Sequence, residues 1–465
     1  MVHGAAAMHL TSLPGRAAVV RELPRRPALW ASGMILLIAV PSGDPTSGIT
    51  AANVTAADVA GALFVVGVAL AVLRGRDVSA LRSRLLLCPV VMVAAAALST
   101  VLSSDPAFSL IGLLRFVEIF CLIPVAVVLA VQDRMDVLLI LGSVVVLGAI
   151  EGTVGMYQVL SKTGASFATQ NARAVGTFGI GDQLAMATVV SLAQLVLLAV
   201  ALRGGRARTR RWAGLGVALL SAPLLFSLSR GALIAVVFAA VAMILSSGIM
   251  QSARVLVAIV LLGLGAVVVM SNVETPVVER FATISTAAEQ PDKSVQDRYD
   301  LWATALSMWQ ESPITGVGVK QFATYRDSHA PLGLSSGSDQ ASASTYVRVQ
   351  LLSPHNEYLL LLSEQGVLGF VAFILLLLVL GARHLSRLRA PPGSIVDNVL
   401  RVAALGLLVR YAVECFYGDV AGPAALLFSV LVGLQLRSAV ADKAPLGNSM
   451  RRGFTPRMTS GLLPK

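Results

Sequence analysis

Residues 358–381 have the sequence YLLLLSEQGVLGFVAFILLLLVLG, in which Glu364 is the one charged residue. This run is longer than the roughly 20 apolar residues that an α-helix needs to cross the hydrocarbon core of a bilayer. The whole 465-residue chain has the same character, because 56% of it is hydrophobic and 13% is charged, whereas soluble domains average about 25% charged residues. The composition excludes a cytosolic enzyme, a disordered chain and a disulfide scaffold, and predicts an integral membrane protein.

Further apolar segments on both sides of 358–381 bring the total to about twelve predicted spans. After it come 396–416 and 422–437, and before it come 255–270, 231–248, 212–228, 184–202, 137–160, 109–131, 85–101, 57–73 and 28–41. The 28–41 segment is the shortest and is broken by Pro41. The predicted fold is all-α, a polytopic transmembrane helical bundle with one large extracytoplasmic helical loop.

The positions of lysine and arginine predict how this bundle is oriented. An even number of spans puts both termini on one side; that side carries 24 of the 36 basic residues, and the opposite side carries nine. Excess positive charge marks the cytoplasmic side, so the net charge of +11 indicates membrane anchors, and nucleic-acid binding is not expected. The predicted organisation is a cytoplasmic N-terminal segment 1–27, spans one to nine in 28–270, a large extracytoplasmic loop 271–357, spans ten to twelve in 358–437 and a basic cytoplasmic tail 438–465.

The loop 271–357 is long enough to be functional rather than a simple connection. Its stretch from Val295 to Gln310 predicts a helix with Arg298, Trp302 and Trp309 on one face. Two tryptophans on one face favour a position at the level of the lipid headgroups. Residues 326–347 are rich in serine, glycine and alanine and are expected to form a flexible insert.

Three residues that could carry chemistry are predicted at the outer membrane surface. Arg230 lies between two spans, Arg298 lies on the interfacial helix, and His355 follows Ser353-Pro354, a pair expected to cap the span-ten helix and to place His355 in its first turn. Alone, each has an ordinary structural interpretation, as a snorkelling arginine, a solvated helix residue or a capping histidine. Together they offer two cations for a lipid phosphate and one base for a proton.

Charged residues inside the predicted spans form a second group. Arg115 and Glu118 are three residues apart and Arg410 and Glu414 are four apart, so each pair is predicted to form an ion pair on one helical face. Glu151 and Asp419 have no such partner in sequence.

Several familiar signatures are missing from the chain. It has no D-x-D motif and no phosphate-binding G-x-x-x-x-G-K-[ST] loop, and its three cysteines lie far apart within apolar runs. We therefore predict no metal ion and no cofactor.

Four segments, in order, carry a resemblance to a known family. They are Gly176-Thr177-Phe178-Gly179 before Leu184-Ala185, then Ser229-Arg230-Gly231-Ala232, then Arg298 to Trp302 followed by Pro313 and Gly316-Val317-Gly318, and finally Pro354-His355-Asn356-Glu357-Tyr358-Leu359 followed by Glu364, Gly366 and Gly369. In these segments the chain resembles the O-antigen ligase/polymerase superfamily of bacterial membrane glycosyltransferases. It departs from the family pattern at Gly181-Asp182-Gln183, where the family commonly has Pro-Asn.

The resemblance implies a function in cell-surface polysaccharide assembly at the bacterial inner membrane. Members of the superfamily transfer a glycan from undecaprenyl diphosphate to an acceptor hydroxyl on a glycan, lipid or protein, without metal or nucleotide. By this resemblance Arg230 and Arg298 would bind the diphosphate, and His355 would position or deprotonate the acceptor hydroxyl. The attack of that hydroxyl would invert the anomeric carbon. Asp419 and Glu357 are additional candidates. Whether the chain is a ligase or a polymerase stays open.

A transporter or flippase of an anionic lipid or solute is the alternative, because about twelve spans and intramembrane charges also suit transport. A transporter would place its polar groups near the membrane midplane on broken helices. The glycosyltransferase hypothesis instead requires Arg230, Arg298 and His355 to converge at the outer surface.

Overall fold

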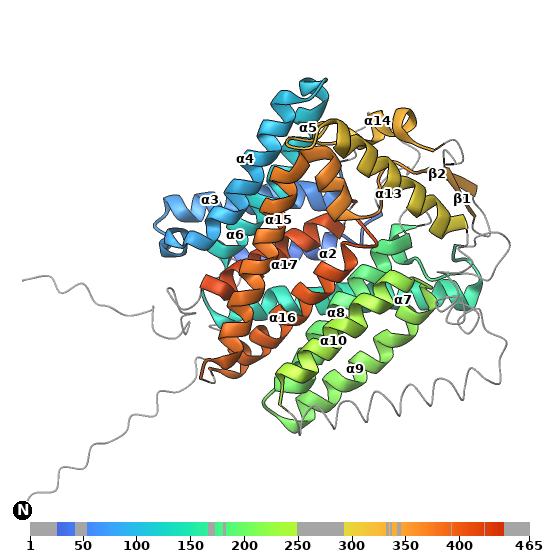
Figure 1. Cartoon of the computed structure of the whole chain (residues 1–465). Coiled ribbons are helices and arrows are strands. Elements are labelled where there is room, and N and C mark those ends of the chain that lie inside the picture. Colours follow the sequence, from blue (N-terminus) through green and yellow to red (C-terminus); the bar gives the residue numbers. More distant parts are fainter. Residues whose placement is uncertain are drawn as a thin grey trace, which may run out of the picture.

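The computed structural model describes residues 26–41, 54–165, 173–179, 183–248, 293–331, 334, 337–341, 346–391, 393–422 and 424–440, and α-helices dominate these ranges (Figure 1). The α-helices are α2 (Pro27–Leu37), α3 (Ala56–Leu73), α4 (Leu87–Leu102), α5 (Pro106–Val117), α6 (Ile123–Ala130), α7 (Arg134–Ser161), α8 (Gln183–Arg203), α9 (Ala207–Phe226), α10 (Arg230–Ser246), α13 (Lys293–Glu311), α14 (Phe322–His329), α15 (Glu357–Arg389), α16 (Ile395–Glu414) and α17 (Ala424–Val440). A π-helical turn, Glu118–Leu122, joins α5 to α6.

Six helical segments among the described residues are long and apolar enough to cross a membrane. They are Ala56–Leu73, Arg84–Leu102, Pro106–Ala130, Arg134–Ser161, Leu184–Arg203 and Glu357–Arg389, with shorter apolar helices at Pro27–Leu37, Arg230–Ser246 and Ala424–Val440. The predicted count of about twelve is not confirmed. Helices α9 and α16 coincide with predicted spans but carry several charged residues, and the predicted span 255–270 lies outside the described residues.

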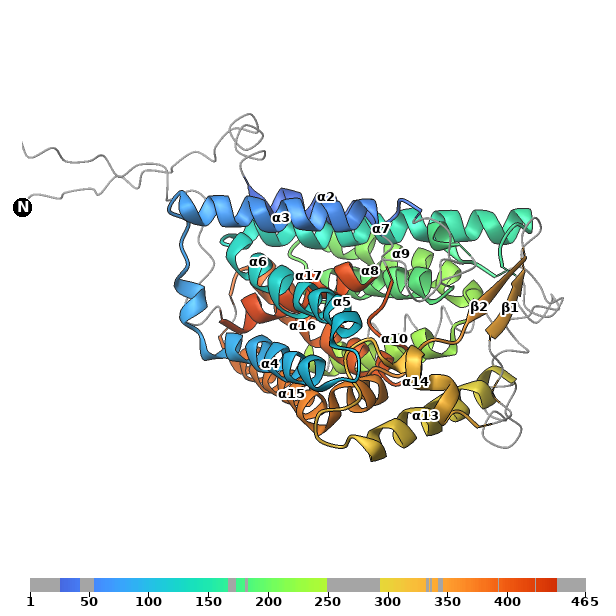
Figure 2. The same ribbon diagram turned by 90° about the horizontal axis from the view of Figure 1, so that it is seen from above.

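The helices pack around two apolar clusters. The larger cluster is built mainly from α2, α6, α7, α8 and α17, and the second from α4, α15, α16 and α17. Figure 2 shows α2 and α3 side by side along one face of the bundle and α4 and α15 along the opposite face, with α16 and α17 between them. Helix α16 packs against α8, α10 and α15; its C-terminal end is therefore central in the bundle.

Helix α13 covers one end of this bundle and confirms the helix predicted from Val295 to Gln310. Leu301, Ala305 and Met308 on its buried face form a third cluster with Val317 and Phe322. The prediction that residues 326–347 form a flexible insert is wrong for parts of this segment. Helix α14 extends to His329, and β1 (Gly337–Ala341) pairs antiparallel with β2 (Tyr346–Gln350). The β-branched and aromatic residues of β2 favour a strand despite the serine-rich surroundings.

A break in α15 fixes the chain that follows α13. Gly366 has φ 64°, and the segment 313–318 lies against this break so closely that a Cβ on Gly316 would be 2.3 Å from the carbonyl carbon of Glu364. The buried Glu364 carboxylate accepts the N–H groups of Lys320 and Phe322, each at 2.9 Å. The segment from Pro313 to Gly318 and the Glu364–Gly366 break, both part of the family resemblance, thus connect α13 to α15.

Candidate active site at the loop between α16 and α17

The loop 415–422 between α16 and α17 is the point where the candidate residues meet. The N–H of Glu357 donates to the carbonyl oxygens of Cys415 at 2.8 Å and Gly418 at 3.1 Å. The Glu357 carboxylate accepts the N–H of Val420 at 2.8 Å. Glu357 is therefore buried by and bound to this loop, and its contacts give it a structural role rather than exposure to a ligand.

His355 lies beside this loop, just before α15. The structure corrects the predicted cap, because α15 begins at Glu357 and the N-cap residue is Asn356, whose side chain accepts the N–H of Leu359 at 3.1 Å. His355 therefore lies outside the helix, with φ 48°. Its Nδ1 atom is 3.5 Å from Oδ1 of Asp419 and 3.5 Å from Oγ of Ser353.

The environment of Asp419 keeps its carboxylate ionised. Burial raises the pKa of Asp419, but hydrogen bonds from His355 and Ser353 and the electrostatic attraction of His355 outweigh burial, so that the pKa is lowered from its ordinary value. The side chain of Asp419 is 14% exposed and that of His355 is 32% exposed. A carboxylate facing Nδ1 orients the ring and favours the proton on that nitrogen.

Helix α13 brings Arg298 and Trp302 to the same place. Arg298 Nη1 donates to the carbonyl oxygen of Tyr417 at 3.0 Å, two residues before Asp419. One turn later, Trp302 Nε1 donates to the carbonyl oxygen of Pro354 at 3.0 Å, directly before His355. The helix thus contacts both chain segments that carry the His355–Asp419 pair.

Arg230 reaches this region as the first residue of α10. Ser229 caps the helix by accepting the N–H of Ala232 at 3.4 Å. The next residue, Gly231, approaches Tyr417 so closely that a Cβ at this position would lie 2.8 Å from the Tyr417 Cβ atom. The N-terminal end of α10 is thus packed against the residue whose carbonyl Arg298 binds.

Arg173, which the sequence did not single out as a candidate, supports the turn before Arg230. Its Nε and Nη2 atoms donate to the carbonyl oxygen of Ser227 at 3.1 and 2.8 Å. These bonds brace the turn that leads through Leu228, at φ 52°, to Arg230. The only signal in the sequence was its position among the few basic residues on the predicted outer side.

The Gly176 segment lies beside this turn and is held by α7. The buried Glu151 carboxylate accepts the N–H of Thr177 at 2.9 Å and its hydroxyl at 2.7 Å. The Gln158 side chain donates to the carbonyl of Gly176 at 2.8 Å. Glu151, unpartnered in sequence, is thus a structural acceptor for the segment.

The two predicted intramembrane ion pairs are confirmed. Arg115 Nη1 is 2.7 Å from both Glu118 and Asp58. Arg410 pairs with Glu414, whose carboxylate also accepts the Thr188 hydroxyl at 2.6 Å. These groups compensate one another within the helical bundle.

The structure therefore gathers Arg298, His355, Asp419 and Glu357 around one loop, with Arg230 next to it through Gly231. Within the described ranges, no group of three or more histidine, cysteine, aspartate or glutamate side chains is placed to hold a metal ion. The cations of this region would suit the oxygens of a phosphate.

A family model described as O-antigen ligase matches residues 215–374. The resemblance to the O-antigen ligase/polymerase superfamily is thereby confirmed. The O-antigen ligase match includes α10 with Arg230, α13 with Arg298, and His355 with the first part of α15 that follows it, whereas Asp419 lies beyond the match. Together with the apolar helices, this match supports an O-antigen ligase-like glycosyltransferase that is an integral membrane protein.

Among solved structures, a chain from a study of polymerization and crosslinking by a peptidoglycan synthase complex is similar to this chain. The two share 17% sequence identity, the match covers 78% of this chain and 98% of the other, and the TM-score is 0.41. A TM-score of this size does not establish a common fold. No curated protein sequence matches the chain.

Proposed function

We propose that this protein transfers a glycan from undecaprenyl diphosphate to an acceptor hydroxyl, with inversion and without a metal ion, at the extracytoplasmic face of the bacterial inner membrane. The observation that carries the proposal is the meeting of Arg298, His355 and Asp419 at the loop 415–422, from three segments far apart in sequence. Arg230 begins the helix that packs on the same loop.

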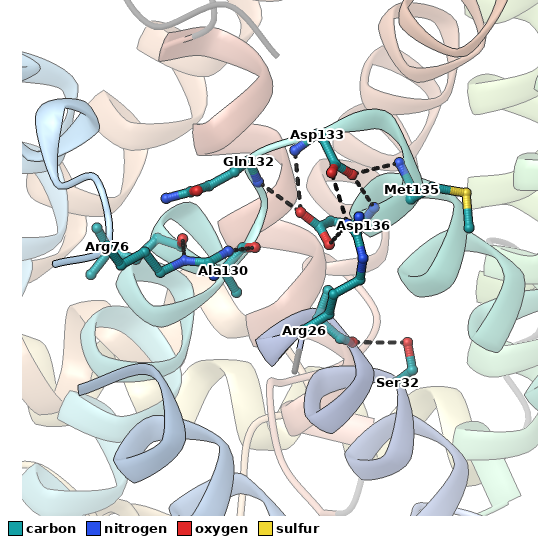
Figure 3. A network of polar contacts seen from close by, with 10 residues as sticks. Arg26, Ser32, Arg76, Ala130, Gln132, Asp133, Met135 and Asp136 are labelled. Atoms are coloured by element: carbon teal, nitrogen blue, oxygen red, sulfur yellow. Dashed lines mark hydrogen bonds and ion pairs between the residues drawn. The ribbon is translucent and has the colours of Figure 1, made fainter. Parts of the chain in front are cut away.

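The pairing of loops supports the proposed side of the membrane. Segments expected in the cytoplasm contact one another at one end of the bundle, where Arg26 binds Asp133 and Asp136 and Arg76 binds the carbonyl of Ala130 (Figure 3). Segments expected outside contact one another at the candidate site. The excess of arginine and lysine in the first set favours the cytoplasm for that end, which supports an outer-leaflet position for the site.

The proposed reaction is a single displacement. The acceptor oxygen forms a bond to the anomeric carbon while the bond from that carbon to the diphosphate oxygen breaks, and the hydroxyl proton passes to His355. The departing lipid diphosphate keeps the electron pair, and Arg230 and Arg298 stabilise its charge. A guanidinium fork matches phosphate oxygens in a bidentate manner, so arginines would replace a divalent cation.

The His355–Asp419 pair assigns a nitrogen to the proton transfer. Because Nδ1 faces Asp419 at 3.5 Å, the opposite ring nitrogen, Nε2, would accept the acceptor proton. The ionised Asp419 would then stabilise the imidazolium that forms, as a carboxylate does in a catalytic triad.

Transfer can be tested with purified protein in detergent and a lipid-diphosphate-linked oligosaccharide, in EDTA and without nucleotide. Wild type is compared with His355→Ala, Arg298→Ala and the exposed control Arg82→Ala. We expect longer or transferred glycans from wild type and the control, and a loss of about 100-fold or more in the two site variants. Equal activity in all four would overturn the site, and substrate movement in liposomes without any product would favour transport. The product itself would distinguish a polymerase from a ligase.

A further inference from the structure

Two tryptophans of α13 make the same kind of bond with different neighbours. Trp302 Nε1 donates to the carbonyl oxygen of Pro354 at 3.0 Å, and Trp309 Nε1 donates to that of Pro313 at 3.1 Å. The Pro354 carbonyl belongs to the peptide bond that leads into His355. The Pro313 carbonyl lies just past the end of α13 and belongs to the segment that joins it to α14.

The backbone at His355 needs support from its surroundings. A residue other than glycine in the left-handed region costs on the order of 1–2 kcal/mol, and His355 has φ 48°. Such a conformation persists only where neighbouring contacts enforce it. The Ser353 hydroxyl accepts the N–H of His355 at 3.3 Å, and Asn356 caps α15 on the other side.

Trp302 supplies a third restraint, from outside this segment. Pro354 is buried, and a buried carbonyl without a donor is unfavourable. The indole N–H satisfies this carbonyl. The Trp302 ring also packs edge-on against Tyr299, with ring centroids 5.7 Å apart, so the indole has its own support on α13.

We propose that Trp302 is a positioning residue that sets the separation between the diphosphate-binding Arg298 and the base His355. Arg298 and Trp302 are four residues apart on one helix, about 6 Å along its axis. Arg298 donates to the carbonyl of Tyr417, and Trp302 donates to that of Pro354. Helix α13 therefore fixes the distance between Arg298 and the backbone that carries His355. This inference rests on the proposed glycan transfer.

Two matched substitutions test the role of the indole N–H. Trp302→Phe and Trp309→Phe each keep an aromatic ring and remove one N–H that donates to a proline carbonyl. We expect Trp302→Phe to lower kcat about tenfold, because small displacements of a catalytic group reduce rates strongly, with the KM for the lipid donor unchanged. Trp309→Phe should stay within about twofold of wild type.

A loss of folded protein would also lower kcat, so a second measurement separates the two causes. Donor-binding stoichiometry should equal that of wild type in both variants. In a double-mutant cycle, Trp302→Phe should have little further effect when His355 is already alanine, because both changes remove the same contribution.

Each outcome bears on a different claim. Wild type that transfers no glycan would overturn the proposed function. Wild type that transfers glycan, with Trp302→Phe as active as Trp309→Phe or with additive effects in the cycle, would overturn the positioning role and leave the proposed function intact.

Discussion

At the end of the bundle drawn in Figure 3, Arg26 donates to the carboxylates of Asp133 and Asp136 at 2.8 and 2.9 Å. At the opposite end, Arg298 donates to the carbonyl oxygen of Tyr417. In the same region the Glu357 carboxylate accepts the N–H of Val420, and the Asp419 carboxylate faces His355.

The difference shows two uses of the same side chains. At the first end, guanidinium and carboxylate groups join chain segments, and an aspartate there also caps α7. At the second end, Asp419 orients the ring of the partly exposed His355, and Arg298 binds the backbone of the loop that carries Asp419. Charge at the first end should therefore govern stability, and charge at the second should govern the reaction.

Arginine substitutions should give the largest difference in activity between the two ends. Arg298→Gln and Arg76→Gln each remove a guanidinium that donates to backbone carbonyls. We expect Arg298→Gln to lower kcat/KM for the lipid donor about 100-fold, since a cation that stabilises transition-state charge is lost. Arg76→Gln should change kcat/KM per folded molecule less than about twofold. Steady-state transfer assays, normalised to folded protein, would measure both, and equal losses would remove the distinction.

Aspartate substitutions should show a smaller contrast of the same kind. Asp419→Asn keeps the shape but removes the charge that orients His355, and we expect roughly a tenfold to hundredfold loss in kcat. Asp397, which pairs with Arg134 at 3.4 Å at the other end, is the control, and Asp397→Asn should leave kcat nearly unchanged. An unimpaired Asp419→Asn would exclude Asp419 from the proton transfer.

The lowered pKa of Asp419 adds a prediction about stability and pH. A carboxyl group whose pKa is lower in the folded state stabilises the fold above its ordinary pKa, and this contribution is lost as the pH falls through the lowered value. The difference in Tm between wild type and Asp419→Asn should therefore shrink on acidification below about pH 4. Thermal unfolding across a pH series would measure it. A difference that grows toward acid would show that the sign is wrong.

Helix positions were largely predictable because long apolar segments are visible in one sequence. The break at Gly366 was not, since it depends on the approach of 313–318 to α15. The β1–β2 pairing was also hidden, because composition describes a segment's average and strands depend on the alternation within Tyr346–Gln350.

The members of the candidate site could be proposed from the sequence, but their geometry could not. Arg298, His355 and Asp419 were all candidates from the sequence, and the structure brings them to one loop. The cap of α15 was wrongly predicted because serine and asparagine are both good N-cap residues, and the left-handed backbone of His355 decides between them. The tie from Trp302 to Pro354 requires tertiary contact and had no sequence signal.

The smallest expected effect on the reaction comes from the network in Figure 3. The Asp136 carboxylate accepts the N–H groups of Gln132 and Asp133 at 3.0 and 3.2 Å and pairs with Arg26. Asp136→Asn should destabilise the protein by about 1–3 kcal/mol, because a buried charged acceptor is lost, and should leave kcat/KM per folded molecule unchanged. Thermal unfolding and transfer assays on the same preparation would measure both, with the exposed Arg82→Gln as control. A fall in kcat/KM without a fall in Tm would mean that this end communicates with the site, and the division of labour between the two ends would then fail.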